Sequence, residues 1–156
     1  MDEMNHLADD GTVRMVDVGA KAETQRRAVA VADVAIEDST AERLFGGDLP
    51  KGDALATVRI AAIQATKRTP DLIPLCHPLA ISGVDVTVER SASGATVTVD
   101  VRVAGRTGVE MEAMTGAAVG ALALYDMVKG IDRSAEIVSV RLLHKAGGRT
   151  GEWHRD

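Results

Sequence analysis

VDVTVERSASGATVTVDVRV, residues 84–103, is the stretch that decides the fold. Valine occupies every second position from Val84 to Val88 and again from Val97 to Val103, with mostly polar residues between. A period of two is typical of strands that bury one face and expose the other. The serine- and glycine-containing segment 91–94 between the two runs favours a turn. These residues therefore predict a β-hairpin and, with it, an antiparallel sheet.

The segment after the hairpin is GVEMEAMTGAAVGALALYDMVK, residues 108–129, a long apolar helix whose second half is broken only by Asp126 and Lys129. An acid and an amine three residues apart share one helix face. On an apolar helix such groups lose hydration, which makes their pKa values adjustable and suits acid/base chemistry. A solvated pair worth about 0.3–0.5 kcal/mol explains the same spacing. The segment alone leaves both interpretations open.

The flanking residues complete an ordered series of elements. Residues 26–36 predict a first strand, and Asp38, Ser39 and Thr40 are candidate caps of a short helix that ends at Gly46 and Gly47. Asp53 is expected to cap a helix over residues 53–68, and residues 137–143 predict a last strand. The order strand, helix pair, strand, strand, helix, strand predicts an α+β fold, a ferredoxin-like split βαβ sandwich with helices on one face of an antiparallel sheet.

The connection TPDLIPLCHP, residues 69–78, contains three prolines and is predicted to be extended and rigid, with no helix. It holds Cys76 and His77 side by side. A metal-binding or thiol role for this pair is the minority hypothesis, because the sequence offers no second cysteine and no H-x-x-x-H spacing.

Bulk properties narrow the class of protein. A chain of 156 residues fits one domain, and we expect a mobile leader at 1–13 followed by a single domain at 14–156. The acidic start carries no signal-peptide pattern, and no apolar run approaches the roughly 20 residues of a membrane span, so a cytoplasmic location is expected. The single cysteine excludes an internal disulfide. A net charge of -5 and only three aromatic residues disfavour nucleic acid as a partner.

Phosphate-binding fingerprints of the Walker and Rossmann types are absent from the sequence. Lys51 stands just ahead of a predicted helix N-terminus, where an anion is favoured, although a solvated loop lysine explains it equally well. Glu110 and Glu112 can point the same way toward one ligand or form a solvated edge. Gly116 and Gly120 weaken the long helix by roughly 0.5–1 kcal/mol each, so we expect close helix packing to compensate.

Taken together, several short motifs are specific. They are MVDV (15–18), KGD (51–53), ATKRT (65–69), LIPLCHPL (72–79), RTGVEMEA (106–113), LYDM (124–127) and KAGGR (145–149). In order and in register over about residues 12–153, the chain resembles the cyclic pyranopterin monophosphate synthase family of molybdenum cofactor biosynthesis. Thr66 departs from the alanine that is more usual there.

The resemblance implies a lyase that converts (8S)-3′,8-cyclo-7,8-dihydroguanosine 5′-triphosphate into cyclic pyranopterin monophosphate and releases pyrophosphate. It also implies a homohexamer of ferredoxin-like subunits with active sites at subunit interfaces. No cofactor and no resident metal are expected, although a divalent cation can accompany the triphosphate. The expected partners are this small molecule and further copies of the chain, with no membrane.

The same resemblance assigns site residues. The expected catalytic residues are Asp126, Lys129, Lys51 and His77. The expected substrate-binding residues are Leu75, Cys76, His77, Met111, Glu112, Glu110, Arg26 and Lys67, the last two as cations for the triphosphate. Two alternatives stay open: a non-catalytic nucleotide sensor of the same fold, and a scaffold in which the charges stabilise a subunit interface.

Overall fold

The computed structural model describes residues 7–8, 10–149 and 151–156. Its elements, in chain order, are β1 Thr24–Ala35, α1 Asp38–Gly46, α2 Ala54–Lys67, α3 Thr69–Leu72, β2 Gly83–Ser91, β3 Gly94–Gly105, α4 Glu110–Val128, β4 Glu136–Ala146 and β5 Trp153–His154. The predicted leader at 1–13 lies largely outside the described residues. Within the part of it that is described, Leu7 and Val13 form an isolated antiparallel bridge.

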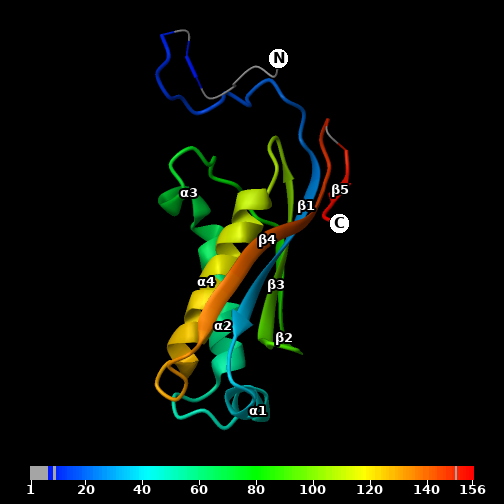
Figure 1. Cartoon of the computed structure of the whole chain (residues 1–156). Helices are drawn as coiled ribbons and strands as arrows, with labels where there is room; N and C mark the ends of the chain where they lie inside the picture. Colours follow the sequence, from blue (N-terminus) through cyan, green and yellow to red (C-terminus); the bar gives the residue numbers. More distant parts are fainter. Residues whose placement is uncertain (1–6, 9, 150) are drawn as a thin grey trace.

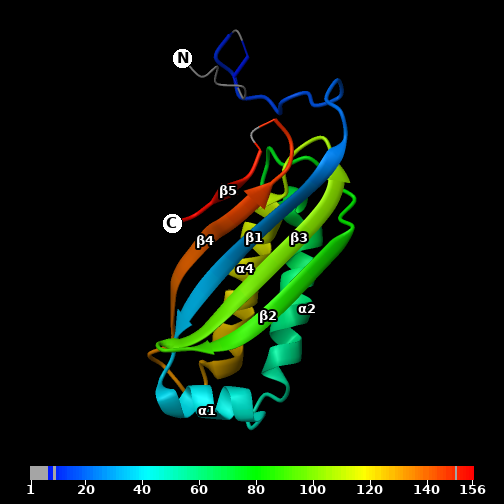
Figure 2. The same ribbon diagram turned by 90° about the vertical axis from the view of Figure 1, so that its right-hand side faces the viewer.

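The strands form one antiparallel sheet in the order β2-β3-β1-β4-β5. The hairpin β2–β3 lies beside β1, and both crossovers skip one strand, as in a split βαβ unit. Helices α2 and α4 cover one face of the sheet, and α1 lies across one end (Figures 1 and 2). The predicted α+β, ferredoxin-like fold is confirmed, including the extra helix in the first crossover.

The core lies between the sheet and α4 and is built from small and β-branched side chains. In β1, Ala28, Ala30 and Ala32 are fully buried and pair with three valines of β3, as Ala28 does with Val101. On α4, the fully buried residues Ala113, Ala117, Ala121 and Leu124 recur at helical spacing and face this surface. Short side chains on both sides bring the helix axis close to the sheet.

Glycine extends this close contact to α2. A Cβ atom on Gly116 would lie 2.5 Å from the Thr66 Oγ1, and one on Gly120 would lie 3.2 Å from the Ala62 Cβ. Thr66 also donates hydrogen bonds to the carbonyl oxygens of Ala62 and Glu112. The expected compensation for helical glycine is therefore confirmed: α4 touches α2 through backbone that a larger residue would push apart.

The other face of the sheet carries cross-strand ion pairs. Arg27 of β1 donates to Asp100 of β3 at 2.7 Å, and Arg102 of β3 donates to Asp85 of β2 at 2.6 Å. These groups alternate with the buried valines along the same strands. The prediction of one apolar and one polar face for the hairpin is confirmed.

Three local predictions need correction. The 69–78 connection is not extended throughout, because Thr69–Leu72 forms the short helix α3 with Pro70 in its first turn, where a missing N–H costs nothing. Helix α1 begins at Asp38, and in place of the predicted caps Asp38, Ser39 and Thr40 its N-cap residue is Glu37, whose backbone N–H donates to the Asp132 Oδ2 at 2.8 Å. The last strand, predicted over residues 137–143, is longer, Glu136–Ala146, and the tail after it folds back as β5.

We expect Gly116→Ala to lower the free energy of unfolding by about 1–3 kcal/mol, because the added methyl group overlaps the Thr66 hydroxyl. Urea unfolding measures the change. Gly46→Ala is the matched control: nothing lies within 4 Å of its Cβ position at the end of α1, so it should be neutral or stabilising. Adding Thr66→Ala should recover part of the loss; equal loss in the double variant would show that the contact is not the cause.

Candidate active site

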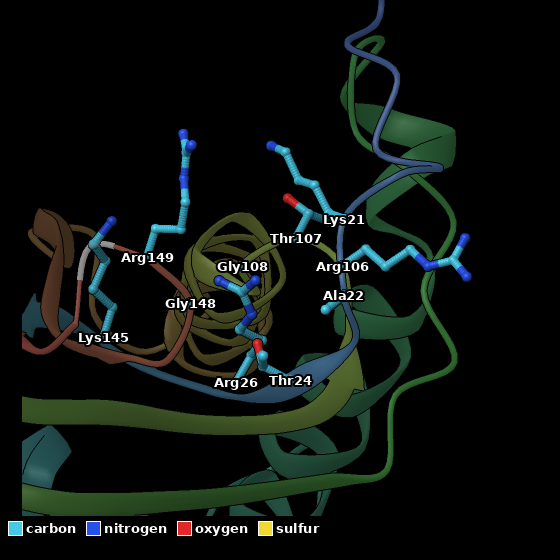
Figure 3. A pocket seen from close by; sticks show the side chains of 10 residues that line it. All are labelled: Lys21, Ala22, Thr24, Arg26, Arg106, Thr107, Gly108, Lys145, Gly148 and Arg149. Atoms are coloured by element: carbon cyan, nitrogen blue, oxygen red, sulfur yellow. The ribbon is translucent and has the colours of Figure 1, made fainter.

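A cationic cavity of about 640 Å³ opens at the end of the molecule where β1 begins, α4 begins and β4 ends. Its lining residues with a positive side chain are Lys21, Arg26, Arg106, Lys145 and Arg149, and the lining includes no acidic side chain. Figure 3 shows Lys21 and Arg149 facing one another across the opening, with Arg26 below them, while Arg106 points away. Three chain segments, far apart in sequence, thus concentrate positive charge in a protein of net charge -5.

The tail loop that carries Arg149 crosses directly over Arg26. A Cβ atom on Gly148 would overlap the Arg26 guanidinium, and one on Gly147 would overlap the Gln25 carbonyl oxygen. Gly147 and Gly148 also have positive φ, +100° and +75° respectively, which other residues rarely adopt. Among the described residues, the buried Arg26 Nε has no hydrogen-bond partner. An anion that enters the cavity can supply one.

A second cavity of about 420 Å³ adjoins the first and shares Lys21, Thr107 and Gly108 with it. Its further lining residues are Val16, Leu75, Cys76, His77, Leu79, Glu110, Met111 and Glu112. The structure therefore brings together six of the predicted substrate-binding residues, which come from the proline-rich connection and from the first turn of α4. One ligand can reach both cavities.

Two groups of the second cavity can hold or move protons. The His77 Nε2 lies 2.7 Å from the Val16 carbonyl oxygen, which can only accept a hydrogen bond, so Nε2 must be the donor. The Nε2–H tautomer is thus favoured and leaves Nδ1 as a base. Burial raises the pKa of the Glu112 carboxyl, its own backbone N–H lowers it, and the charge of Glu110 raises it again, with a net rise. Glu112 is 3% exposed, so its carboxyl holds a proton more readily than a solvated one does.

Cys76 stands beside these groups as a thiol. Burial, followed by the negative charge of Glu112, raises its pKa. A raised pKa lowers the thiolate fraction near neutral pH, which disfavours the nucleophile hypothesis. The side chain contributes to the wall of the cavity.

Asp126 and Lys129 form an ion pair at 2.7 Å, and Lys51 also donates to Asp126 at 3.0 Å. Their side chains are 43–55% exposed. The expected loss of hydration is therefore wrong for the single chain. Hydrogen bonds from Lys129 and then Lys51 lower the pKa of Asp126, and the bond to Asp126 raises the pKa of Lys129. These hydrogen bonds favour the ionised forms of Asp126 and Lys129.

Within a single chain, the predicted site residues lie in two separate groups. In α4, Asp126 lies sixteen positions beyond Glu110, which is beside the cavities, and at a rise of 1.5 Å per residue this is about 24 Å. Lys51 lies with Asp126 at the far end. Lys67, exposed at the end of α2, lines neither cavity.

The predicted site residues do not include four cations of the first cavity: Lys21, Arg106, Lys145 and Arg149. The KAGGR motif at 145–149 contains a signal for two of them, since paired glycines next to basic residues are typical of backbone that closely approaches an anion. Lys21 stands in no motif, and only the fold brings it to the opening. Lys145 also pairs with Glu110 at 3.0 Å, which links the cationic cavity to α4.

A cluster of cations that opens onto a carboxyl with a raised pKa and an oriented histidine defines an enzyme that acts on a small phosphorylated molecule. The comparisons agree. Residues 15–148 match the model of the MoaC family, and the chain belongs to this family.

Curated relatives resemble the chain over nearly its whole length. Cyclic pyranopterin monophosphate synthase of Roseiflexus castenholzii is 54% identical, over 97% of this chain and 98% of the relative. The enzymes of the same name from Corynebacterium efficiens and Streptomyces coelicolor are 48% and 49% identical, over 98% and 99% of this chain and 99% and 91% of the relatives.

We expect Glu112→Gln to stabilise the protein increasingly as pH rises. A carboxyl with a raised pKa contributes stability that is fully present below its unfolded value, near 4.5, and is lost as pH rises through the folded value. The variant lacks this loss, so the Tm difference, variant minus wild type, should increase from acidic to mildly alkaline pH. The exposed Glu89→Gln serves as control and should show a constant difference. A Glu112→Gln difference that is equally flat would contradict the raised pKa.

Gly148→Ala should weaken pyrophosphate binding at least tenfold, because the new methyl group displaces the Arg26 guanidinium from the cavity. Gly151→Ala is a matched control: its φ of +70° is close to the +75° of Gly148, but nothing lies within 4 Å of its Cβ position. Calorimetric titration with inorganic pyrophosphate measures affinity, and thermal unfolding shows whether both variants lose similar stability. Equal pyrophosphate affinities in the two variants would show that Arg26 does not contribute to anion binding.

Proposed function

We propose that this chain converts (8S)-3′,8-cyclo-7,8-dihydroguanosine 5′-triphosphate into cyclic pyranopterin monophosphate, with release of pyrophosphate, in molybdenum cofactor biosynthesis. The observation that carries the proposal is the junction of the two cavities at Lys21, Thr107 and Gly108. One cavity suits a phosphate chain and the other suits a ring system that must gain and lose protons. The name shared by the relatives supplies the product.

The triphosphate carries about four negative charges near pH 7, so several cations must converge on it. Lys21, Arg26, Lys145 and Arg149 surround the first cavity and meet this need. The same groups stabilise the charge that develops on pyrophosphate as it leaves, because the fold gathers them at one cavity. The proposal requires no resident cofactor, and a divalent cation that accompanies the triphosphate would share the charge.

The rearrangement opens one ring and closes another, so protons must move at defined atoms. His77 offers Nδ1 as a base, and Glu112, whose raised pKa makes its carboxyl hold a proton more readily, offers an acid, both at the wall of the second cavity. Asp126 and Lys129 act as a further proton-transfer pair, with Lys51 as their cationic neighbour. Substrate must compete with Lys51 and Lys129 for Asp126 before that pair can react.

We further propose that the active site lies between subunits of a homohexamer, a trimer of dimers. About 24 Å of helix separates the two groups of site residues in one chain, which is too far for a ligand to touch both. A neighbouring copy that brings its Lys51, Asp126 and Lys129 to the cavities completes the site and removes water from this exposed triad. That burial would supply the desolvation that the single chain does not provide.

The protein is placed in the cytoplasm in this proposal, where its nucleotide-derived substrate is available. Within the described part of the chain, no helix combines the length and apolarity needed to cross a bilayer.

Single-turnover conversion of the cyclic triphosphate tests the function. Wild type should form pyranopterin and pyrophosphate, and Asp126→Asn should bind the substrate within a few-fold of wild type but react at least about a hundredfold more slowly. If wild type binds the substrate but releases no pyrophosphate, the enzyme proposal fails and the nucleotide-sensor alternative replaces it. Size-exclusion chromatography of Asp126→Asn is the control, because a scaffold role predicts loss of assembly at unchanged affinity.

Mixing of variants tests the shared site. Asp126→Asn and His77→Ala subunits, each inactive alone, should recover activity when they reassemble together, with about one site in four intact in a random mixture. Two variants of the same group, Asp126→Asn and Lys129→Ala, supply the matched control and should not recover. Absence of recovery in the first mixture, with mixed assembly shown by mass spectrometry, would place the whole site within one subunit.

A further inference from the structure

The C-terminal strand β5 brings three potential metal ligands together: its own His154, Glu152 just before it, and His144 of β4. His154 of β5 pairs directly with His144 of β4 in antiparallel register. Directly opposed residues have Cβ atoms about 4.5–5.5 Å apart and project to the same side. Glu152 immediately precedes β5, and its carboxylate reaches both of these imidazoles. Figure 1 shows β5 as a short strand beside the end of β4.

The three side chains converge on one point. The Nε2 atoms of His144 and His154 lie 2.8 and 3.1 Å from the same oxygen, Oε1 of Glu152. The imidazole rings stack with centroids 4.3 Å apart. All three ligand atoms lie within 4.8 Å of one another. None of these residues lines either cavity of the candidate active site.

We propose that His144, Glu152 and His154 form a binding site for a divalent transition metal of the zinc type. Two imidazoles and one carboxylate are a donor set that zinc accepts, with water as the fourth ligand. At metal–ligand bonds of about 2.0–2.1 Å, tetrahedral geometry separates ligand atoms by about 3.3 Å. The observed nitrogen–oxygen distances open to this value through small side-chain rotations.

The backbone holds these ligands in position before any metal arrives. The Arg155 N–H donates to the Leu143 carbonyl oxygen at 2.8 Å, and its Nε donates to that of Leu142 at 2.7 Å, so β5 is fastened just beyond His154. His144 is anchored by β4, which pairs with β1, and its side chain is only 11% exposed. The exposed Glu152 and His154 have freedom to adjust around an ion. The fixed backbone limits the entropy that these two side chains lose when they close around an ion.

The site joins the two ends of the loop that carries Gly147, Gly148 and Arg149. His144 lies before this loop and Glu152 after it, so a bound ion would clamp the loop over the cationic cavity. The metal would thus restrain Arg149 without touching the substrate. This inference is independent of the proposed function, because it rests on ligands that take no part in that site.

Calorimetric titration of ZnCl₂ into tag-free wild-type protein tests the site, with the visible absorption of four-coordinate Co²⁺ as a second readout. We expect one ion per chain, and a rise in Tm of about 5 °C or more at Zn²⁺ a hundredfold above Kd. His154→Ala and Glu152→Gln should each lower the affinity at least tenfold and abolish the Tm rise. Their side chains are 66% and 61% exposed, so the variants should remain folded.

Glu136→Gln is the matched control for removal of one negative charge, since Glu136 is exposed at the start of the same strand β4. It should bind Zn²⁺ as wild type does. Hydrogen exchange of the 147–149 amides should slow on Zn²⁺ addition in wild type and in the control, but not in His154→Ala. Equal Zn²⁺ affinity in wild type and in the two ligand variants would overturn the proposal, as would wild type that binds no ion.

Discussion

The rest of the structure depends on the close packing of α4 against the sheet. Alanine in β1 and alanine and glycine on α4 let backbone approach backbone, and no larger side chain fits between them. Burial of the valine face of β3 supplies the driving force, at roughly 25 cal/mol per Å² of apolar surface. The distance of the helix from the sheet and its position along the sheet are therefore fixed, and so are the positions of the groups at its two ends.

This fixed helix explains the division of the candidate active site. Its first turn sets Glu110 and Glu112 against the proline-rich connection, where burial changes the chemistry of a carboxyl. Its last turn presents Asp126 to solvent, where two lysines keep it ionised. The same helix thus carries one group that favours a proton and one that gives it up readily, and a site shared between subunits is the arrangement that joins them.

Local sequence patterns predicted secondary structure well where the spacing of apolar residues along the backbone determines it. The period of two in 84–103 and the spacing in 108–129 predicted the hairpin and the long helix, because burial of one face is written into alternate or helical positions. They failed where the local structure depends on a residue distant in sequence, or where a residue type departs from its usual preference. Pro70 sits in the first turn of α3, where it is harmless, and α1 is capped by Asp132, 95 residues away in sequence. A two-residue strand such as β5 has no period to detect.

The sequence by itself determined the order of elements, the buried faces, the family to which the chain belongs and the residue types that carry its chemistry. Those properties follow from short-range spacing and from motifs. Only the tertiary structure decided which charges gather at one cavity, that Glu112 is buried while Asp126 is solvated, and that His144, Glu152 and His154 meet across two strands. Burial and electrostatic environment depend on residues distant in the chain, and their distances are set by how helix and sheet pack rather than by position in the sequence.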